Sequence, residues 1–127
     1  MPSIHSPHFT LNFLRAVVAA VSLGLACVAA SSMTLREMRA LEKSDKRQGE
    51  NYVNYFLVGA MEGALEAHNQ AVRKGAKPSI CLHGRRLEPS MARTLFDREL
   101  QRNVGVYEAD MSVQLVITNA LNTAYTC

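Results

Sequence analysis

Residues 48–73 read QGENYVNYFLVGAMEGALEAHNQAVR, and no other stretch carries one helical pattern for so long. Apolar and small side chains recur at steps of three and four residues, which is the spacing of one face of an α-helix. The pattern stops at Lys74-Gly75, and glycine is common just beyond the end of a helix. We therefore predict a long helix over 48–73. Its expected buried face consists of Tyr52, Tyr55, Phe56, Gly59, Ala60, Gly63, Ala64, Ala67 and Ala71.

Two glycines, Gly59 and Gly63, stand four residues apart on that face. Each costs about 1 kcal/mol of helix propensity relative to alanine. A helix that carries this cost is expected to use the missing side chains to bring another backbone close. We predict a close-packing role for both glycines, either within the domain or across a homodimer interface.

A shorter helix is predicted before the long one. Thr34 and Glu37 have the spacing of a capping box, in which a hydroxyl and a carboxylate satisfy the first free amides of a helix. We expect this helix to end near Lys43 and a charged break to follow over 44–49. Its inward residues are expected to be Leu35, Met38 and Leu41.

Two further helices are predicted after the long one. Pro89 suits the first turn of a helix that runs to about Arg102. The last helix is expected from about Glu108 to Tyr125. Together these patterns predict an all-α fold, a compact bundle of about four helices in one domain over 31–127. The inward residues are expected to be Ala92, Leu95, Phe96, Leu100, Val113, Val116, Ile117, Ala120, Leu121 and Ala124.

The first 30 residues have the layout of a cleaved secretory signal peptide. Arg15 comes just before an apolar run over 16–30, and the run closes on small residues. The run is short for a membrane span, which takes about 20 residues. We therefore expect export and no stable membrane insertion after cleavage. A short anchoring helix and lipidation at Cys27 are the two alternatives.

The cysteine count depends on that cleavage, because it leaves only Cys81 and Cys127. An exported protein with two cysteines most simply joins them in one disulfide. The bond would close a loop of about 47 residues, for which chain entropy suggests about 4 kcal/mol of stabilisation. It would tie the end of the last helix to the middle of the fold. Two free thiols in a cytosolic protein are the alternative.

The charge and composition argue against nucleic-acid binding, because the net charge is small and aromatic side chains that could stack on bases are few. The net charge is +3, and removal of residues 1–30 lowers it to +2. Nucleic-acid-binding domains are usually much more basic. The chain has no tryptophan. We expect no nucleic-acid partner.

The sequence offers little that predicts catalysis. His68 and His83 have no second histidine or cysteine at metal-ligand spacing, and there is no phosphate-binding or dinucleotide-binding glycine pattern. Cys81 and His83 are two residues apart, but a disulfide-bonded sulfur cannot act as a nucleophile. We expect no enzyme activity, no metal and no cofactor.

The connection over 74–90 is the most distinctive polar segment. It contains four glycines and prolines, and five positive charges between Arg73 and Arg86 occur without an intervening acidic residue. Such a loop is suited to complement an acidic cleft on a protein partner. The alternative is a solvated loop whose charges only keep the protein soluble.

The chain resembles the Tai-type (Rap-type) immunity proteins of bacterial type VI secretion along nearly the whole of 31–127. The residues that carry the resemblance are Tyr52, Tyr55, Gly59, Gly63, Cys81-Leu82, Ala120-Leu121 and Ala124-Tyr125-Thr126-Cys127. The resemblance implies a small periplasmic helical protein, often a homodimer. Its partner would be a cell-wall (peptidoglycan) amidase effector injected by a sibling cell, whose active-site cleft it occludes.

Residues in the irregular connections are the expected contacts with that partner. We predict partner-binding roles for His83, Arg85, Arg86 and, more weakly, Tyr107. Three other functions compete with this prediction: a small periplasmic chaperone, a structural accessory of the cell envelope, and an enzyme.

Overall fold

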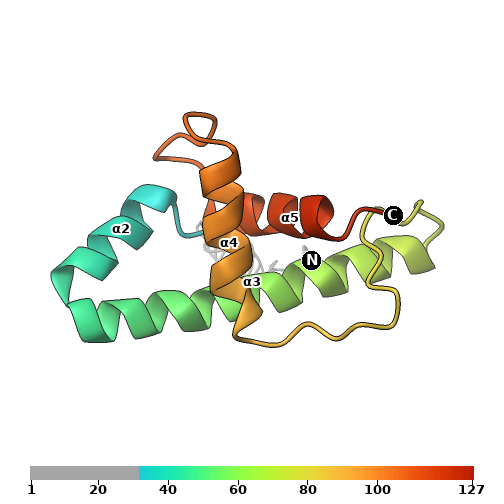
Figure 1. The fold of residues 1–127 in the computed structure, drawn as a ribbon, viewed down its shortest axis with the longest axis horizontal. Coiled ribbons are helices and arrows are strands. Elements are labelled where there is room, and N and C mark those ends of the chain that lie inside the picture. Colours follow the sequence, from blue (N-terminus) through green and yellow to red (C-terminus); the bar gives the residue numbers. More distant parts are fainter. Residues whose placement is uncertain (1–31) are drawn as a thin grey trace, which may run out of the picture. The chain divides into compact units, whose positions relative to one another are not determined.

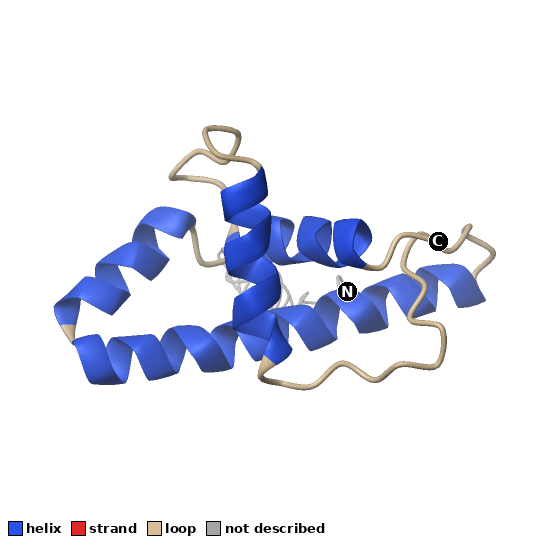
Figure 2. Ribbon diagram, viewed as in Figure 1, coloured by secondary structure: helices blue, strands red, loops and turns tan. Residues whose placement is uncertain are grey.

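The computed structural model describes residues 32–127, which form four α-helices joined by turns and irregular segments (Figure 1). The predicted all-α class and the Cys81–Cys127 disulfide are confirmed. Within the described part there is no β-strand, only two isolated bridges between single residues (Figure 2). The predicted signal peptide lies outside the described residues. The helices are α2 (Leu35–Ser44), α3 (Lys46–Arg73), α4 (Met91–Arg102) and α5 (Val113–Ala124).

The start of α2 is the predicted capping box. The Thr34 amide donates to Oε2 of Glu37 at 2.7 Å, and the Glu37 amide donates to the Thr34 hydroxyl at 3.2 Å. Two of the amides that a helix leaves without partners are thereby satisfied.

One residue, Asp45, separates α2 from α3. Oδ1 of Asp45 accepts from the amides of Arg47 at 3.0 Å and Gln48 at 2.9 Å, so this carboxylate caps α3. The predicted break over 44–49 was too long, because α3 already begins at Lys46. The charged residues that suggested a loop form the exposed first turn of a capped helix instead.

The glycine that brings two helices close is Gly49. It is buried, and a Cβ atom at this position would overlap the carbonyl oxygen of Leu41 in α2. Any side chain here would therefore push the two backbones apart. This contact fixes how α2 leaves the junction and packs on α3 (Figure 1).

The buried face of α3 differs from the predicted one. Ala60 and Ala64 are buried as expected, but Tyr52 and Tyr55 are exposed. The two aromatic residues lie on the side of the helix away from the core. The prediction failed because α3 carries apolar residues on more than one side, so its periodicity fits more than one buried face. The buried residues of α3 are Gly49, Val53, Leu57, Ala60, Met61 and Ala64.

Helix α4 crosses α3 and α5 and packs on both (Figure 1). Phe96 is fully buried, and Leu100 lies partly buried against the same core. Helix α5 closes the core at this crossing. Ala124 is exposed, contrary to the prediction, but the other predicted inward residues are buried as expected: Val113, Val116, Ile117, Ala120 and Leu121.

Helix α5 begins at Val113 and not near Glu108 as predicted. The carbonyl oxygens of Met111 and Ala109 accept from the amides of Leu35 at 3.0 Å and Arg36 at 2.7 Å. Residues 108–112 therefore cap the start of α2 instead of continuing a helix. Ser112 then caps α5, its hydroxyl accepting from the Leu115 amide at 3.2 Å.

No helix within residues 32–127 is long and apolar enough to cross a membrane.

Candidate functional site: a disulfide-anchored loop

The candidate site is the anchored loop, defined as residues 79–88, within the irregular connection between α3 and α4. Helix α3 ends at Arg73, and Gly75 reverses the chain with a φ of +100°. A side chain is strained in that backbone region, so glycine suits the position. From there to α4 the chain has no regular secondary structure apart from one bridge.

The base of the anchored loop is held by both a covalent bond and backbone hydrogen bonds. Cys81 and Cys127 are disulfide-bonded, with their Cα atoms 4.9 Å apart. The Cys81 amide donates to the Tyr125 carbonyl oxygen at 2.7 Å, and the Cys127 amide donates to the Ser79 carbonyl oxygen at 3.4 Å. Ile80 is buried in the core. The loop is therefore fixed against segment 125–127 and the helical core.

The outer end of the anchored loop is a tight turn that carries His83. His83 and Gly84 have φ values of +51° and +77°, and the Arg85 amide donates to the Leu82 carbonyl oxygen at 3.0 Å. Positive φ at both central residues is what a type I′ turn requires. The turn leaves His83 exposed at the surface.

Arg85 and Arg86 follow this turn and are both exposed. The Arg85 guanidinium carbon lies 5.8 Å from the centroid of the Tyr125 ring, within the range of a cation–π contact. Within residues 32–127 neither arginine forms an ion pair. Their positive charges are therefore available to a carboxylate on another molecule.

A hollow lies between the anchored loop and α3. Its volume is about 270 Å³, and its lining is mostly apolar but includes three charged residues. Leu82 and Leu87 supply the loop side and are only partly buried. In the sequence, apolar residues stand on either side of the arginine pair, and this is the signal that could have predicted the hollow. The lining residues are Met61, Glu62, Leu65, Leu82, Arg85, Arg86 and Leu87.

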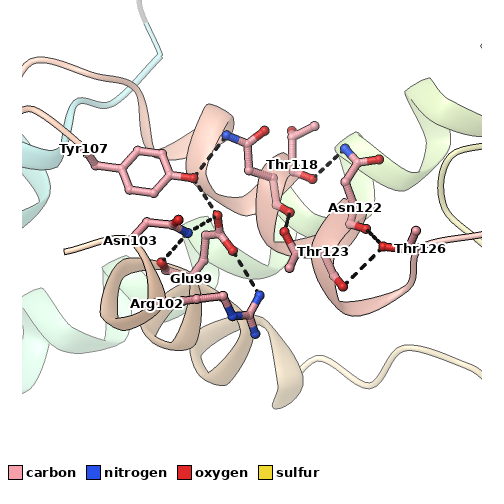
Figure 3. Close-up of polar contacts among 9 residues, drawn as sticks. Glu99, Arg102, Asn103, Tyr107, Thr118, Asn122, Thr123 and Thr126 are labelled. Carbon is pink, nitrogen blue, oxygen red and sulfur yellow. Dashed lines mark hydrogen bonds and ion pairs between the residues drawn. The ribbon is translucent and has the colours of Figure 1, made fainter. Parts of the chain in front are cut away.

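Tyr107, a predicted partner contact, is part of an internal polar network (Figure 3). Its hydroxyl donates to Oε1 of the buried Glu99 at 2.7 Å and accepts from the side-chain Nδ2 of Asn119 at 3.1 Å. Asn103 donates to the same carboxylate oxygen at 2.8 Å. Burial and then the hydrogen bond to Glu99 raise the pKa of Tyr107. The network joins α4 to α5, and it gives Tyr107 a packing role within the chain.

Gly59 and Gly63 are exposed on α3, and a Cβ atom at either position would meet no atom within 4 Å. The expectation that they pack against another backbone within the domain was therefore wrong. The alternative, an interface between two copies of the chain, stays a prediction.

The residues considered for catalysis are not brought together. His68 Nδ1 lies 3.5 Å from the Ser79 hydroxyl oxygen. Between residues 32 and 127, no group of three or more histidine, cysteine, aspartate or glutamate side chains is placed to hold a metal ion. Cys81, two residues from His83, has its sulfur bonded to Cys127.

Comparisons with models of protein families, with curated proteins and with solved structures found no match to this chain.

Proposed function

We propose that this chain is a protein inhibitor that binds a cell-wall amidase and occludes its active-site cleft with the anchored loop. One observation carries the proposal: the loop presents two exposed arginines beside an apolar hollow, on a backbone held by the Cys81–Cys127 disulfide. The resemblance to type VI immunity proteins supplies the class of partner.

A loop that is pre-organised before its partner binds is suited to tight binding. A flexible loop loses conformational freedom when a partner orders it, and that loss reduces the affinity. The disulfide and the hydrogen bond from Cys81 to Tyr125 restrict the anchored loop before any partner arrives. Less of the binding free energy is then spent on ordering it.

The side chains on this loop match the composition of strong protein interfaces. Arginine is among the residues that most often dominate binding energy, especially beside apolar contacts that exclude water. Arg85 and Arg86 line the hollow together with Leu82 and Leu87. A cleft with acidic groups around an apolar centre would complement this surface.

The proposed place of action is the periplasm, after export directed by residues 1–30. The Cys81–Cys127 disulfide suits an oxidising compartment. Inhibition there needs no chemistry from the inhibitor, only stoichiometric binding.

A cell-survival experiment tests the proposal. A strain that lacks this chain should lyse when the amidase encoded beside its gene is directed to the periplasm, and the full chain should protect it. A version without residues 1–30 should not protect. Survival of the deletion strain, or lysis despite abundant exported chain, would contradict the proposed function.

Matched variants connect protection to the loop. The double variant Arg85→Ala/Arg86→Ala should fail to protect while accumulating to the parental level. Arg39→Ala removes an exposed arginine from α2 and should protect as well as the parent. Equal protection by all three chains would show that the anchored loop is not the inhibitory surface.

A further inference from the structure

A second hollow lies between the C-terminal half of α3, the start of the anchored loop and α5. Its volume is about 400 Å³, and its lining includes Ala67 of α3, Ile80 of the loop and Thr118 of α5. We call it the α3–α5 hollow. It is distinct from the hollow beside Arg85 and Arg86, because the two have no lining residue in common.

The backbone of Ile80 has an unpaired amide and carbonyl at this hollow. Ile80 forms an antiparallel bridge with Thr126, and the residues on either side of each make the hydrogen bonds of that bridge. Alternate residues of an extended pair bond on opposite sides, so the Ile80 amide and carbonyl point away from segment 125–127. Within residues 32–127 neither group has a hydrogen-bond partner, although Ile80 is only 7% exposed. Unpaired backbone groups in a buried residue are costly, so this edge is suited to a ligand that supplies main-chain donors and acceptors.

Helix α5 supplies a row of acceptor oxygens to the same hollow. Gln114, Thr118 and Asn122 stand four residues apart, so they lie on one face of the helix at intervals of about 6 Å along its axis. Each uses a side-chain donor within the chain: Gln114 donates to the Ala60 carbonyl oxygen at 3.0 Å, and Thr118 to that of Gln114 at 2.8 Å. Asn122 donates from Nδ2 to the Thr118 carbonyl oxygen at 3.0 Å (Figure 3). Their side-chain oxygens accept no hydrogen bond within the described residues, and their spacing is close to the repeat of about 6.6 Å between alternate residues of an extended chain.

The rest of the lining restricts the class of ligand. Among the described residues that line this hollow there is no carboxylate, ammonium or guanidinium group to pair with a charged ligand. Apart from the His68 imidazole, the same residues include no aromatic ring on which a sugar or a base could stack. Gly63 and Ala67 keep the α3 side short, so another backbone can approach closely. A neutral, slender ligand with regularly spaced N–H donors fits these conditions, and a peptide main chain with small side chains is such a ligand.

We propose that the α3–α5 hollow binds an extended internal segment of another polypeptide through its main chain. One residue of the segment pairs with the Ile80 amide and carbonyl, and N–H groups on its other side donate to the side-chain oxygens of α5. The volume is near the lower end of the range for ligand sites, about 300–1,000 Å³, so only a few small residues enter. Charged chain ends would lose their hydration here without a partner, which favours an internal segment over a free peptide. The site goes beyond the inhibitor role and does not depend on it, because neither Arg85 nor Arg86 lines this hollow.

Titration of the isotope-labelled, disulfide-bonded chain with acetyl-Ala-Ala-Ala-amide, followed by NMR, tests the binding. The capped ends make this tripeptide resemble an internal segment. The Ile80 backbone amide and the side-chain amides of Gln114 and Asn122 should shift and saturate together. The same tripeptide with free, charged ends, and acetyl-Ala-Pro-Ala-amide, which lacks the central N–H, should each bind at least about tenfold more weakly. Absence of saturable shifts up to about 10 mM capped tripeptide, or equal affinity for either control peptide, overturns the proposal.

Two matched pairs of variants locate the site. Ala67→Leu fills the hollow from an exposed position of α3 and should abolish the shifts, whereas Ala71→Leu makes the same change one turn later, outside the lining, and should bind like the parent. Thr118→Val and Thr123→Val each remove a hydroxyl that donates to a carbonyl oxygen four residues earlier, but only Thr118 lines the hollow. Only Thr118→Val should weaken binding, by about threefold or more. Parental affinity in folded Ala67→Leu, or equal affinities of the two threonine variants, overturns the proposed location. Because the probe is a peptide and not an amidase, failure here is distinct from failure of the inhibitor role.

Discussion

The Cys81 amide donates a hydrogen bond to the Tyr125 carbonyl oxygen at 2.7 Å, next to the disulfide that joins Cys81 to Cys127. The Arg85 guanidinium carbon lies 5.8 Å from the centroid of the Tyr125 ring. One short segment, 125–127, therefore holds both the backbone and a charged side chain of the anchored loop. The proposed inhibitory surface depends on this attachment.

Loss of the disulfide should destabilise the fold. Replacement of either Cys81 or Cys127 by serine is expected to lower the unfolding free energy by about 2–5 kcal/mol, because the unfolded chain regains the freedom of a long loop. Denaturant unfolding of parent and variants checks this. Mass spectrometry with alkylation should find no free thiol at either position in the native parent, and two free thiols would contradict the assignment.

Substitution by alanine should change the stability of the fold in opposite directions at Gly49 and Gly59 of α3. Gly49→Ala should destabilise the fold by about 1–3 kcal/mol, since its methyl group would overlap the Leu41 carbonyl oxygen. Gly59→Ala should stabilise it by up to about 1 kcal/mol through helix propensity, because nothing stands near the added methyl group. Thermal and denaturant melts of both variants test this contrast. Equal effects at the two positions would contradict the packing described for α2 and α3.

The Glu99 network should contribute to stability and not to partner binding. Tyr107→Phe removes the hydroxyl that bonds Glu99 and Asn119, and is expected to cost about 1–2 kcal/mol of unfolding free energy. Its affinity for the amidase should match that of the parent under conditions where both are folded. If the variant has parental stability but binds the amidase more weakly, Tyr107 contacts the partner and this prediction is wrong.

The capping box at Thr34 and Glu37 predicts one component of the pH dependence of folding stability. Hydrogen bonds from the Thr34 backbone amide and then its hydroxyl lower the pKa of Glu37 below its ordinary value of 4.5. A depressed carboxylate pKa contributes stability above the unfolded-state value, and this contribution is lost as the pH falls through the folded-state value. The parent should therefore exceed Glu37→Gln in stability at neutral pH, and the difference should shrink in acid. A difference that is constant with pH would contradict the assigned cause.

Local signals in the sequence predicted much of this fold. The capping box of Thr34 and Glu37 and the helix-ending Gly75 depend on near neighbours, so their spacing was sufficient. The disulfide followed from the number of cysteines left by the predicted cleavage of residues 1–30.

Features that depend on tertiary contacts could not be predicted from local sequence signals. The outward direction of Tyr52 and Tyr55 depends on which of several apolar sides of α3 meets the other helices. The start of α5 depends on residues 108–112 bonding to a helix more than 70 positions earlier. The hollow beside Arg85 and Arg86 arises only when the loop folds onto α3.

The most direct test of the central claim is the dissociation constant between the purified chain and the amidase encoded beside it, measured by calorimetry together with inhibition of peptidoglycan cleavage. The parent should bind stoichiometrically and stop cleavage. Arg85→Ala/Arg86→Ala should bind at least about 30-fold more weakly, equivalent to about 2 kcal/mol, while Arg39→Ala binds like the parent. Absence of inhibition by the folded parent, or parental affinity in the double variant, would contradict the account.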